Sequence, residues 1–281
     1  MISLLSEPLV QRMLIVGVLV GLATPVVGTY LVQRRMALLG DGIGHVALAG
    51  VAAGWLAGSA ADLAQRDALA VPGAVVFAIV GAVTIERMRA RGAAADVVMA
   101  ILFYGGIATG VLLIGAAGGS NANLLGYLFG SISTVTWADV WVTVALAVVV
   151  VAVGLYLRPA LFTVTHDQEF ARSTGLPVGV LNMVVAVLAA VTITAAMRVV
   201  GVLLVSALMI LPVAIAQQLT RSFSRTMHLA MGVGATLTII GIIITMEHNL
   251  QPGALIVVLG VAGYVVTSIV SGARSRIRRT S

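Results

Sequence analysis

The sequence predicts an all-α protein that crosses a membrane about nine times, and three observations support this fold class. Hydrophobic residues make up 60% of the 281 residues and charged residues only 9%, which is far from the composition of a soluble domain. Apolar runs of about 20 residues, the length that spans the hydrocarbon core, recur along the whole chain. Basic residues fall between these runs. We therefore expect one transmembrane domain over residues 1–281.

The apolar runs define the expected helices in chain order. The boundary between the sixth and seventh runs is the least marked, because only Arg198 interrupts the apolar residues between Gly175 and Gln218. We expect Arg198 to lie in a tight turn there; eight spans is the alternative arrangement. The nine runs are Met13–Val32, Gly42–Ala61, Ala68–Ile85, Val97–Ala117, Trp137–Leu157, Val178–Met197, Val199–Leu219, His228–Met246 and Ala254–Ser271.

The placement of arginine predicts the orientation in the membrane. All sixteen basic residues are arginine. If the loop that holds Arg34 and Arg35 is cytoplasmic, nine alternating spans place thirteen arginines inside and three outside, a strong positive-inside bias. The amino terminus is then outside and the carboxyl terminus inside. The three outer arginines are Arg12, Arg66 and Arg198.

Two absent residue types exclude whole classes of function. The chain has no cysteine, so disulfides, thiolate metal sites and cysteine nucleophiles are excluded. It has no lysine, which the Walker A motif needs to reach nucleotide phosphates. The protein therefore does not itself hydrolyse a nucleotide. The net charge is +6, and the arginines responsible for it lie at the ends of the expected spans. This placement favours contact with an anionic membrane surface over binding of nucleic acid.

A candidate metal site lies at the start of the second apolar run. Asp41 and His45 are four residues apart, so a helix places the carboxylate and the imidazole one turn apart on one face. This pair suits Zn²⁺ or Mn²⁺, and Fe²⁺ equally. The alternative is a polar helix start, with Asp41 as an N-cap and His45 at the membrane interface. Gly50, Gly54 and Gly58 continue a ridge of small residues that suits close helix packing.

Two features are expected on the outer side. Glu247 and His248 end the eighth run and are weaker candidates for receiving an ion, with a solvated helix cap as the alternative reading. The segment from Gly118 to Thr136 has a short apolar centre at Leu124–Phe129. A re-entrant helix, a helix on the membrane surface and a plain loop all fit this pattern.

A short cytoplasmic helix is expected between the fifth and sixth spans, near residues 165–175. Thr165 and Gln168 have capping-box spacing, and Gly175 suits the position after a helix end. Asp167 and Glu169 would lie at the positive end of the helix dipole. The helix would expose Phe170, either to anchor it in a partner's groove or to lay it on the membrane surface.

Four segments in order resemble the permease subunits of ATP-binding cassette (ABC) importers for zinc, manganese or iron. GDGIGHVALAGV (Gly40–Val51) is similar to that family's Gly-Asp-x-x-Ser-His-Ala-x-x-Pro-Gly-Val signature, and HDQEFARSTGL (His166–Leu176) to its cytoplasmic Phe-Asp-x-Glu-x-Ala-x-x-x-Gly segment. VGVLLVSALMILPVAIAQQL (Val200–Leu219) and LQPGALIVVL (Leu250–Leu259) resemble two later spans. The chain departs from these patterns at three positions, which are Gly44 for serine, Ala49 for proline and His166 for phenylalanine.

The resemblance implies a multi-pass permease in the cytoplasmic membrane of a prokaryote. It implies a homodimer of permeases, separate cytoplasmic ATPase subunits, and an external metal-binding receptor that delivers the cargo. No permanently bound cofactor is expected; the divalent metal is transported. The ATPase-coupling residues would be Asp167, Glu169, Phe170, Ala171 and Gly175.

Three other functions compete with this reading. A secondary transporter of metal ions driven by protons or sodium would need acidic groups near span centres. Glu86, Asp96, Asp139 and Glu247 all fall at span ends. A membrane-embedded enzyme is disfavoured because the chain has neither a His-Glu-x-x-His pair nor a Gly-x-Ser-x-Gly elbow. A purely structural membrane subunit is the third alternative, against which the cytoplasmic helix argues.

Overall fold

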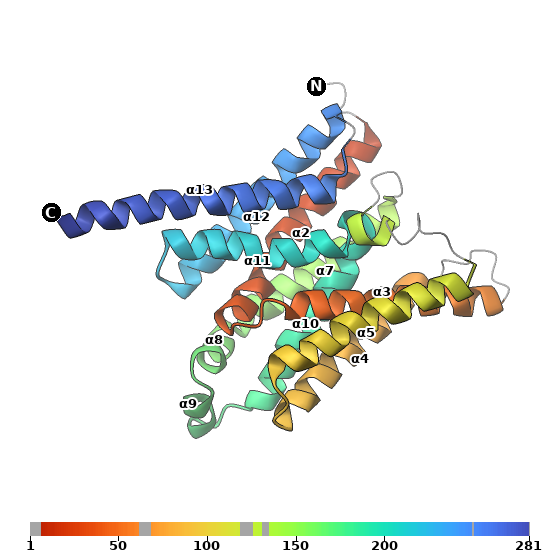
Figure 1. Ribbon diagram of the computed structural model, residues 1–281, viewed down its shortest axis with the longest axis horizontal. Helices are drawn as coiled ribbons and strands as arrows, with labels where there is room; N and C mark the ends of the chain where they lie inside the picture. Colours follow the sequence, from red (N-terminus) through yellow and green to blue (C-terminus); the bar gives the residue numbers. More distant parts are fainter. Residues whose placement is uncertain (1–6, 62–68, 119–125, 131–134, 249, 281) are drawn as a thin grey trace.

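The computed structural model describes residues 7–61, 69–118, 126–130, 135–248 and 250–280. Within them, nine helices are long and apolar enough to cross a membrane, which confirms the predicted all-α membrane fold and its nine spans. Figure 1 shows them packed against one another in one bundle. They are α2 (Pro8–Gln33), α3 (Leu39–Ala60), α4 (Ala70–Ala90), α5 (Ala95–Ala116), α7 (Trp137–Tyr156), α10 (Val178–Val200), α11 (Val202–Leu219), α12 (Phe223–His248) and α13 (Pro252–Thr280).

The spans form two groups joined by α10. Helix α3 packs against α4 and α5 in one group, while α2 packs against α7, α11 and α12 in the other. Helix α10 contacts α2, α3, α4, α7 and α11, so it bridges the groups. The most deeply buried span is α2, whereas α13 is mostly exposed and extends beyond the bundle toward the carboxyl terminus (Figure 1).

Glycines let the backbones of neighbouring spans touch. A Cβ on Gly50 or Gly54 would collide with backbone carbonyls of α4, at Gly73 and Leu69 respectively. The predicted ridge of small residues therefore packs α3 against α4 of the same chain. Close approach of this kind is what brings membrane helices together, because lipid offers no hydrophobic driving force for association.

The sequence predicted the turn between the sixth and seventh spans at Arg198. This prediction was wrong, because the turn lies at Gly201. Helix α10 continues past Arg198 to Val200, and α11 begins at Val202. Gly201 has φ +84° and ψ 151°, a conformation essentially confined to glycine. A side chain there would also lie 2.5 Å from the carbonyl oxygen of Leu128. The position of the turn is therefore set by the backbone conformation of Gly201. The charge of Arg198 indicated only the approximate region of the turn.

Part of the outer segment between α5 and α7 packs onto the bundle. Residues 126–129 form one helical turn, followed by Gly130 with φ +82°. A Cβ on Gly253, in the first turn of α13, would lie 2.6 Å from the carbonyl oxygen of Phe129. The described turn is thus wedged between the α10–α11 junction and α13. The rest of the predicted apolar centre, and Arg66, lie outside the described residues.

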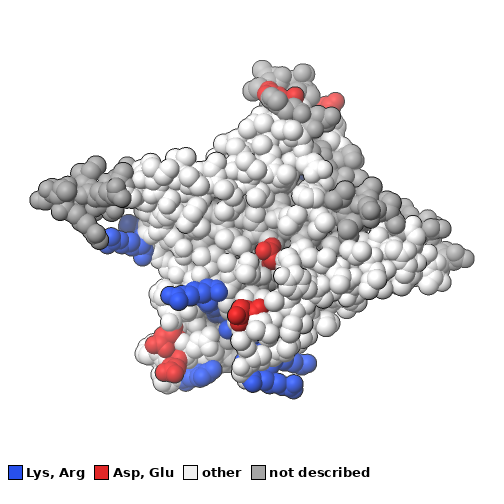
Figure 2. Space-filling view, viewed as in Figure 1, with Lys and Arg blue, Asp and Glu red and all other residues white. Residues whose placement is uncertain are grey.

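Most of the described arginines gather at one end of the bundle. The arginine side chains visible in Figure 2 lie along its lower left edge, beside a broad uncharged surface. We call this the arginine-rich end, and the positive-inside rule predicts that it faces the cytoplasm. Its described arginines are Arg34, Arg35, Arg87, Arg89, Arg91, Arg158, Arg172, Arg221 and Arg225.

We predict that Gly50→Ala destabilises the folded protein, because the added methyl group meets the backbone of α4. Overpacking of this kind costs about 1–3 kcal/mol. Gly105→Ala on α5 is the matched control, since nothing lies within 4 Å of a Cβ there. Thermal unfolding of the two purified variants in detergent checks this, and equal midpoints would contradict the packing argument.

We also predict that the carboxyl terminus lies in the cytoplasm. A reporter enzyme that is active only in the cytoplasm, fused after Arg279, should be active, and a reporter that is active only outside should not. The reverse pattern would reject the orientation. The control is the same pair of reporters fused after Ala61, at the opposite end of α3 from Arg34 and Arg35, where we expect the opposite result.

Candidate metal site and cytoplasmic helices

Asp41 and His45 lie in the first two turns of α3, one helical turn apart as predicted. Asp41 is in the first turn and is half-buried. The N-cap position of α3 is Leu38, with no side-chain hydrogen bond to the helix end, so Asp41 does not act as the cap. His45 is only 5% exposed, which places its imidazole in the protein interior and not at the membrane surface.

The His45 imidazole has a polar atom that the protein leaves free. Its Nδ1 is buried and has no hydrogen-bond partner among the described residues. The ring of Phe103 on α5 packs edge-on against the imidazole, with ring centroids 4.4 Å apart. Gly106, one turn further along α5, brings that helix against the backbone of His45. A buried, unsatisfied nitrogen is costly, and a metal ion is one partner that satisfies it.

Helix α11 closes the other side of this part of α3. A Cβ on Gly44 would lie 2.5 Å from Cγ1 of Val202, so the serine of the similar signature would need Val202 to move. Ser206 on α11 faces Gly40 and its hydroxyl is buried without a partner among the described residues. The family signature has a serine where α3 has Gly44. Nothing in the sequence indicated that Ser206 of α11 would place a hydroxyl near this part of α3.

The described part of one chain supplies too few ligands for a tight metal site. It contains no group of three or more His, Cys, Asp or Glu side chains placed to hold an ion. Glu247 and His248, the weaker candidates, lie at the carboxyl end of α12, on a different helix from Asp41. The structure therefore brings Asp41 and His45 together and leaves the other two apart.

The segment predicted to be cytoplasmic forms two short helices and not one. Helix α8 spans Arg158–His166 and α9 spans Gln168–Ser173. The predicted capping box is wrong, because Thr165 lies inside α8 and donates its hydroxyl to the carbonyl of Leu161 at 2.6 Å. Asp167 caps α9 instead, accepting a hydrogen bond from the backbone N–H of Phe170 at 2.9 Å. An aspartate directly before a helix competes well for that position.

The end of α9 matches the prediction from Gly175. This glycine has φ +81°, its N–H bonds to the carbonyl of Arg172, and the N–H of Leu176 bonds to the carbonyl of Ala171. Together these two bonds form a Schellman motif. Ala171 is buried, while Glu169 is exposed and Phe170 is 57% exposed. The short helix is therefore fixed at both ends and presents an aromatic side chain outward.

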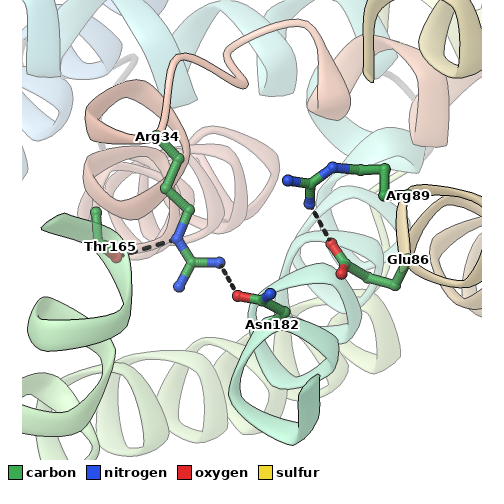
Figure 3. Close-up of polar contacts among 5 residues, drawn as sticks. All are labelled: Arg34, Glu86, Arg89, Thr165 and Asn182. Atoms are coloured by element: carbon green, nitrogen blue, oxygen red, sulfur yellow. Dashed lines mark hydrogen bonds and ion pairs between the residues drawn. The ribbon is translucent and has the colours of Figure 1, made fainter. Parts of the chain in front are cut away.

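The structure also shows a buried polar cluster beside these helices that the sequence did not predict. Arg34, read there only as a span boundary, donates to Thr165 and to Asn182 on α10 (Figure 3). Glu86 and Arg89 of α4 form an ion pair at 2.8 Å on the facing side. Asn182 sits among apolar residues in the sixth run, and a single amide inside an apolar span is the one signal that would have drawn attention to it.

Comparison with known proteins gives consistent results over nearly the whole chain. The manganese transport system membrane protein MntC of Halalkalibacterium halodurans is 31% identical over 92% of this chain and 85% of its own length. The manganese import system permease protein ScaB of Streptococcus parasanguinis is 30% identical over 93% of this chain and 90% of its own length.

A solved structure agrees with these relatives. PsaBC from Streptococcus pneumoniae, in complex with a Fab, superposes with a TM-score of 0.82 at 27% identity and covers 95% of both chains. Residues 6–271 match the family described as the ABC 3 transport family. Since the match takes in every span and the site on α3, the chain belongs to the ABC 3 transport family.

Proposed function

We propose that this protein is the membrane-spanning permease of an ABC importer that carries a divalent transition metal into the cytoplasm. The observation that carries the proposal is the Asp41–His45 pair, with a buried imidazole nitrogen that no described residue satisfies. Manganese is the first candidate, because similar permeases are named for manganese. Zinc and iron(II) suit the same oxygen and nitrogen ligands.

A second copy of the chain would complete the ligand set. Two ligands per chain are too few, but a two-fold axis near α3 doubles them to two carboxylates and two imidazoles. Asp41 is only half-buried, so its carboxylate is open to a ligand or to a neighbouring subunit. Two carboxylates also match the double charge of the ion. We therefore infer that the working permease is a homodimer and that the metal passes between its two copies of α3.

ATP hydrolysis on separate subunits would drive the transport. The chain has no lysine and hence no Walker A motif, so the energy has to enter from another protein. We infer that α9 is the helix that docks on a cytoplasmic ATPase, because it is short, capped at both ends, and exposes Phe170 beside acidic Glu169. An external metal-binding receptor would load the permease from the other side.

A secondary transporter of metal ions is not favoured. The described acidic residues of the spans lie at helix ends, with Asp41, Asp96 and Asp139 in the first turns of their helices. Glu86 lies in the last turns of α4 and is paired with Arg89. A proton or sodium relay needs a series of ionisable groups through the membrane interior, and the described acidic residues do not form such a series.

We predict that Asp41→Ala and His45→Ala each abolish metal uptake without unfolding the permease. The test measures accumulation of Mn²⁺, Zn²⁺ and Fe²⁺ in cells that lack this chain and carry each variant at equal abundance. Asp96→Ala is the control, because Asp96 also lies in the first turn of its helix, α5, but is exposed. Wild-type uptake by both site variants would eliminate the site.

We further predict that Phe170→Ala combined with Glu169→Ala weakens association with the ATPase. Removing a buried aromatic anchor from an interface typically costs about 2 kcal/mol or more, which would reduce the affinity more than tenfold. Co-purification of the two subunits measures this. Ser173→Ala on the same helix is the control, and retention of both association and uptake by the double variant would show that α9 is not the docking helix.

A further inference from the structure

The end of α2 is tied to both helices that flank α9. Nε of Arg34 donates to Thr165 Oγ1 at 3.1 Å, and Nη1 donates to Asn182 Oδ1 at 2.7 Å (Figure 3). Thr165 belongs to α8, which precedes α9, and Asn182 belongs to α10, which follows it. One guanidinium group therefore bridges the two sides of the segment that carries Phe170.

A second bond anchors the same end of α2 to the helix before this segment. One turn before Arg34, the hydroxyl of Tyr30 donates to the carbonyl of Gly154 on α7 at 2.6 Å. The last two turns of α2 are thus held to α7, α8 and α10 in succession.

The link from α2 to α3 is short and conformationally fixed. Arg35 has φ +57°, and its N–H bonds to Val32 while that of Met36 bonds to Leu31. This is a Schellman end with an arginine where glycine is usual. Met36 is buried and its carbonyl accepts from the N–H of Leu39, the first residue of α3. The link therefore has little freedom to absorb a movement.

Arg34 occupies an environment that is unfavourable for a charge. Its Nη2 is buried with no hydrogen-bond partner among the described residues, and both acceptors that hold it are neutral. Burial lowers the pKa of the guanidinium to about 10, opposed by the charge of Glu86, so the group remains protonated at neutral pH. A buried charge with incomplete pairing costs stability. Its presence at this position indicates a use other than stability.

We propose that Arg34 is a positioning residue that couples the ATPase-docking segment to the metal-bearing helix. Its two hydrogen bonds make α8, α10 and the end of α2 one mechanical unit. The fixed link at Arg35 and Met36 passes the movement of that unit to the first turn of α3, where Asp41 lies. The coupling role rests on the proposed import function. The mechanical connection between the docking segment and α3 can be tested without a transported metal ion.

The first test measures distances in the isolated full-length permease. The chain has no cysteine, so spin labels attach only at Leu38→Cys on the link and Ser173→Cys at the end of α9, both exposed positions. Arg34→Gln should broaden the distribution of distances between the labels. Arg87→Gln removes the same charge from an exposed position at the end of α4 and should leave the distribution unchanged. Identical distributions for Arg34→Gln and the unsubstituted labelled protein would overturn the proposal.

A second variant removes the two acceptors and keeps the arginine. Thr165→Val with Asn182→Leu should broaden the same distribution as Arg34→Gln does. Combining all three changes should add little more, because residues that act through one contact are not additive. Additive broadening would show that these residues act separately and would overturn the proposal.

The third test measures coupling in the complex with the ATPase. Arg34→Gln should lower the Mn²⁺ imported per ATP hydrolysed by about tenfold, with association of the ATPase and Mn²⁺ binding at wild-type levels. If Arg34→Gln no longer associates with the ATPase, Arg34 serves only to hold the docking segment in place. That result would overturn the coupling role. Failure of the wild-type complex to import Mn²⁺, Zn²⁺ or Fe²⁺ would instead reject the proposed function, while the distance measurements still decide the connection.

Discussion

The close packing of α3 among its neighbours is the constraint on which the rest of this structure depends. Glycines on α3 or on its partners bring the backbones of α4 and α5 against α3, and Gly44 lets the Val202 side chain of α11 pack against it. These contacts fix the rotation of α3 about its own axis and so decide which of its side chains face inward. His45 is directed inward against Phe103, and Asp41 remains at the half-open end. A looser helix would let both side chains turn toward solvent, and the pair would not face one point.

The number of spans was predictable, because hydrocarbon imposes a length and a polarity on every segment that crosses it. The Asp41–His45 pair was predictable for a related reason, since helical periodicity alone places the two side chains together. The end of α9 at Gly175 followed from the special backbone conformation that a glycine allows. In each case the information lies within a few neighbouring residues.

The features that were missed or misplaced depend on residues distant in sequence. The cap of α9 required a choice between Thr165 and Asp167, and the hydroxyl of Thr165 is engaged both by its own helix and by Arg34. The turn at Gly201 is fixed by the backbone of residues 128–130, more than 70 positions earlier. Arg34 looked like a charge at a span end because its partners lie 131 and 148 residues away. The pattern of residues within one stretch of sequence does not indicate contacts with residues so far away in the chain.

The single-residue connection at Gly201 also bears on how the protein enters the membrane. One residue spans at most about 3.6 Å, so α10 and α11 cannot be delivered to the bilayer one after the other with an intervening loop. They have to insert as a helical hairpin whose tip is drawn through the hydrocarbon. That tip includes Arg198 in the last turn of α10, and carrying an arginine past the bilayer centre costs roughly 2.5–3.5 kcal/mol. Both helices are apolar enough to span the membrane, and inserting them together offsets that cost.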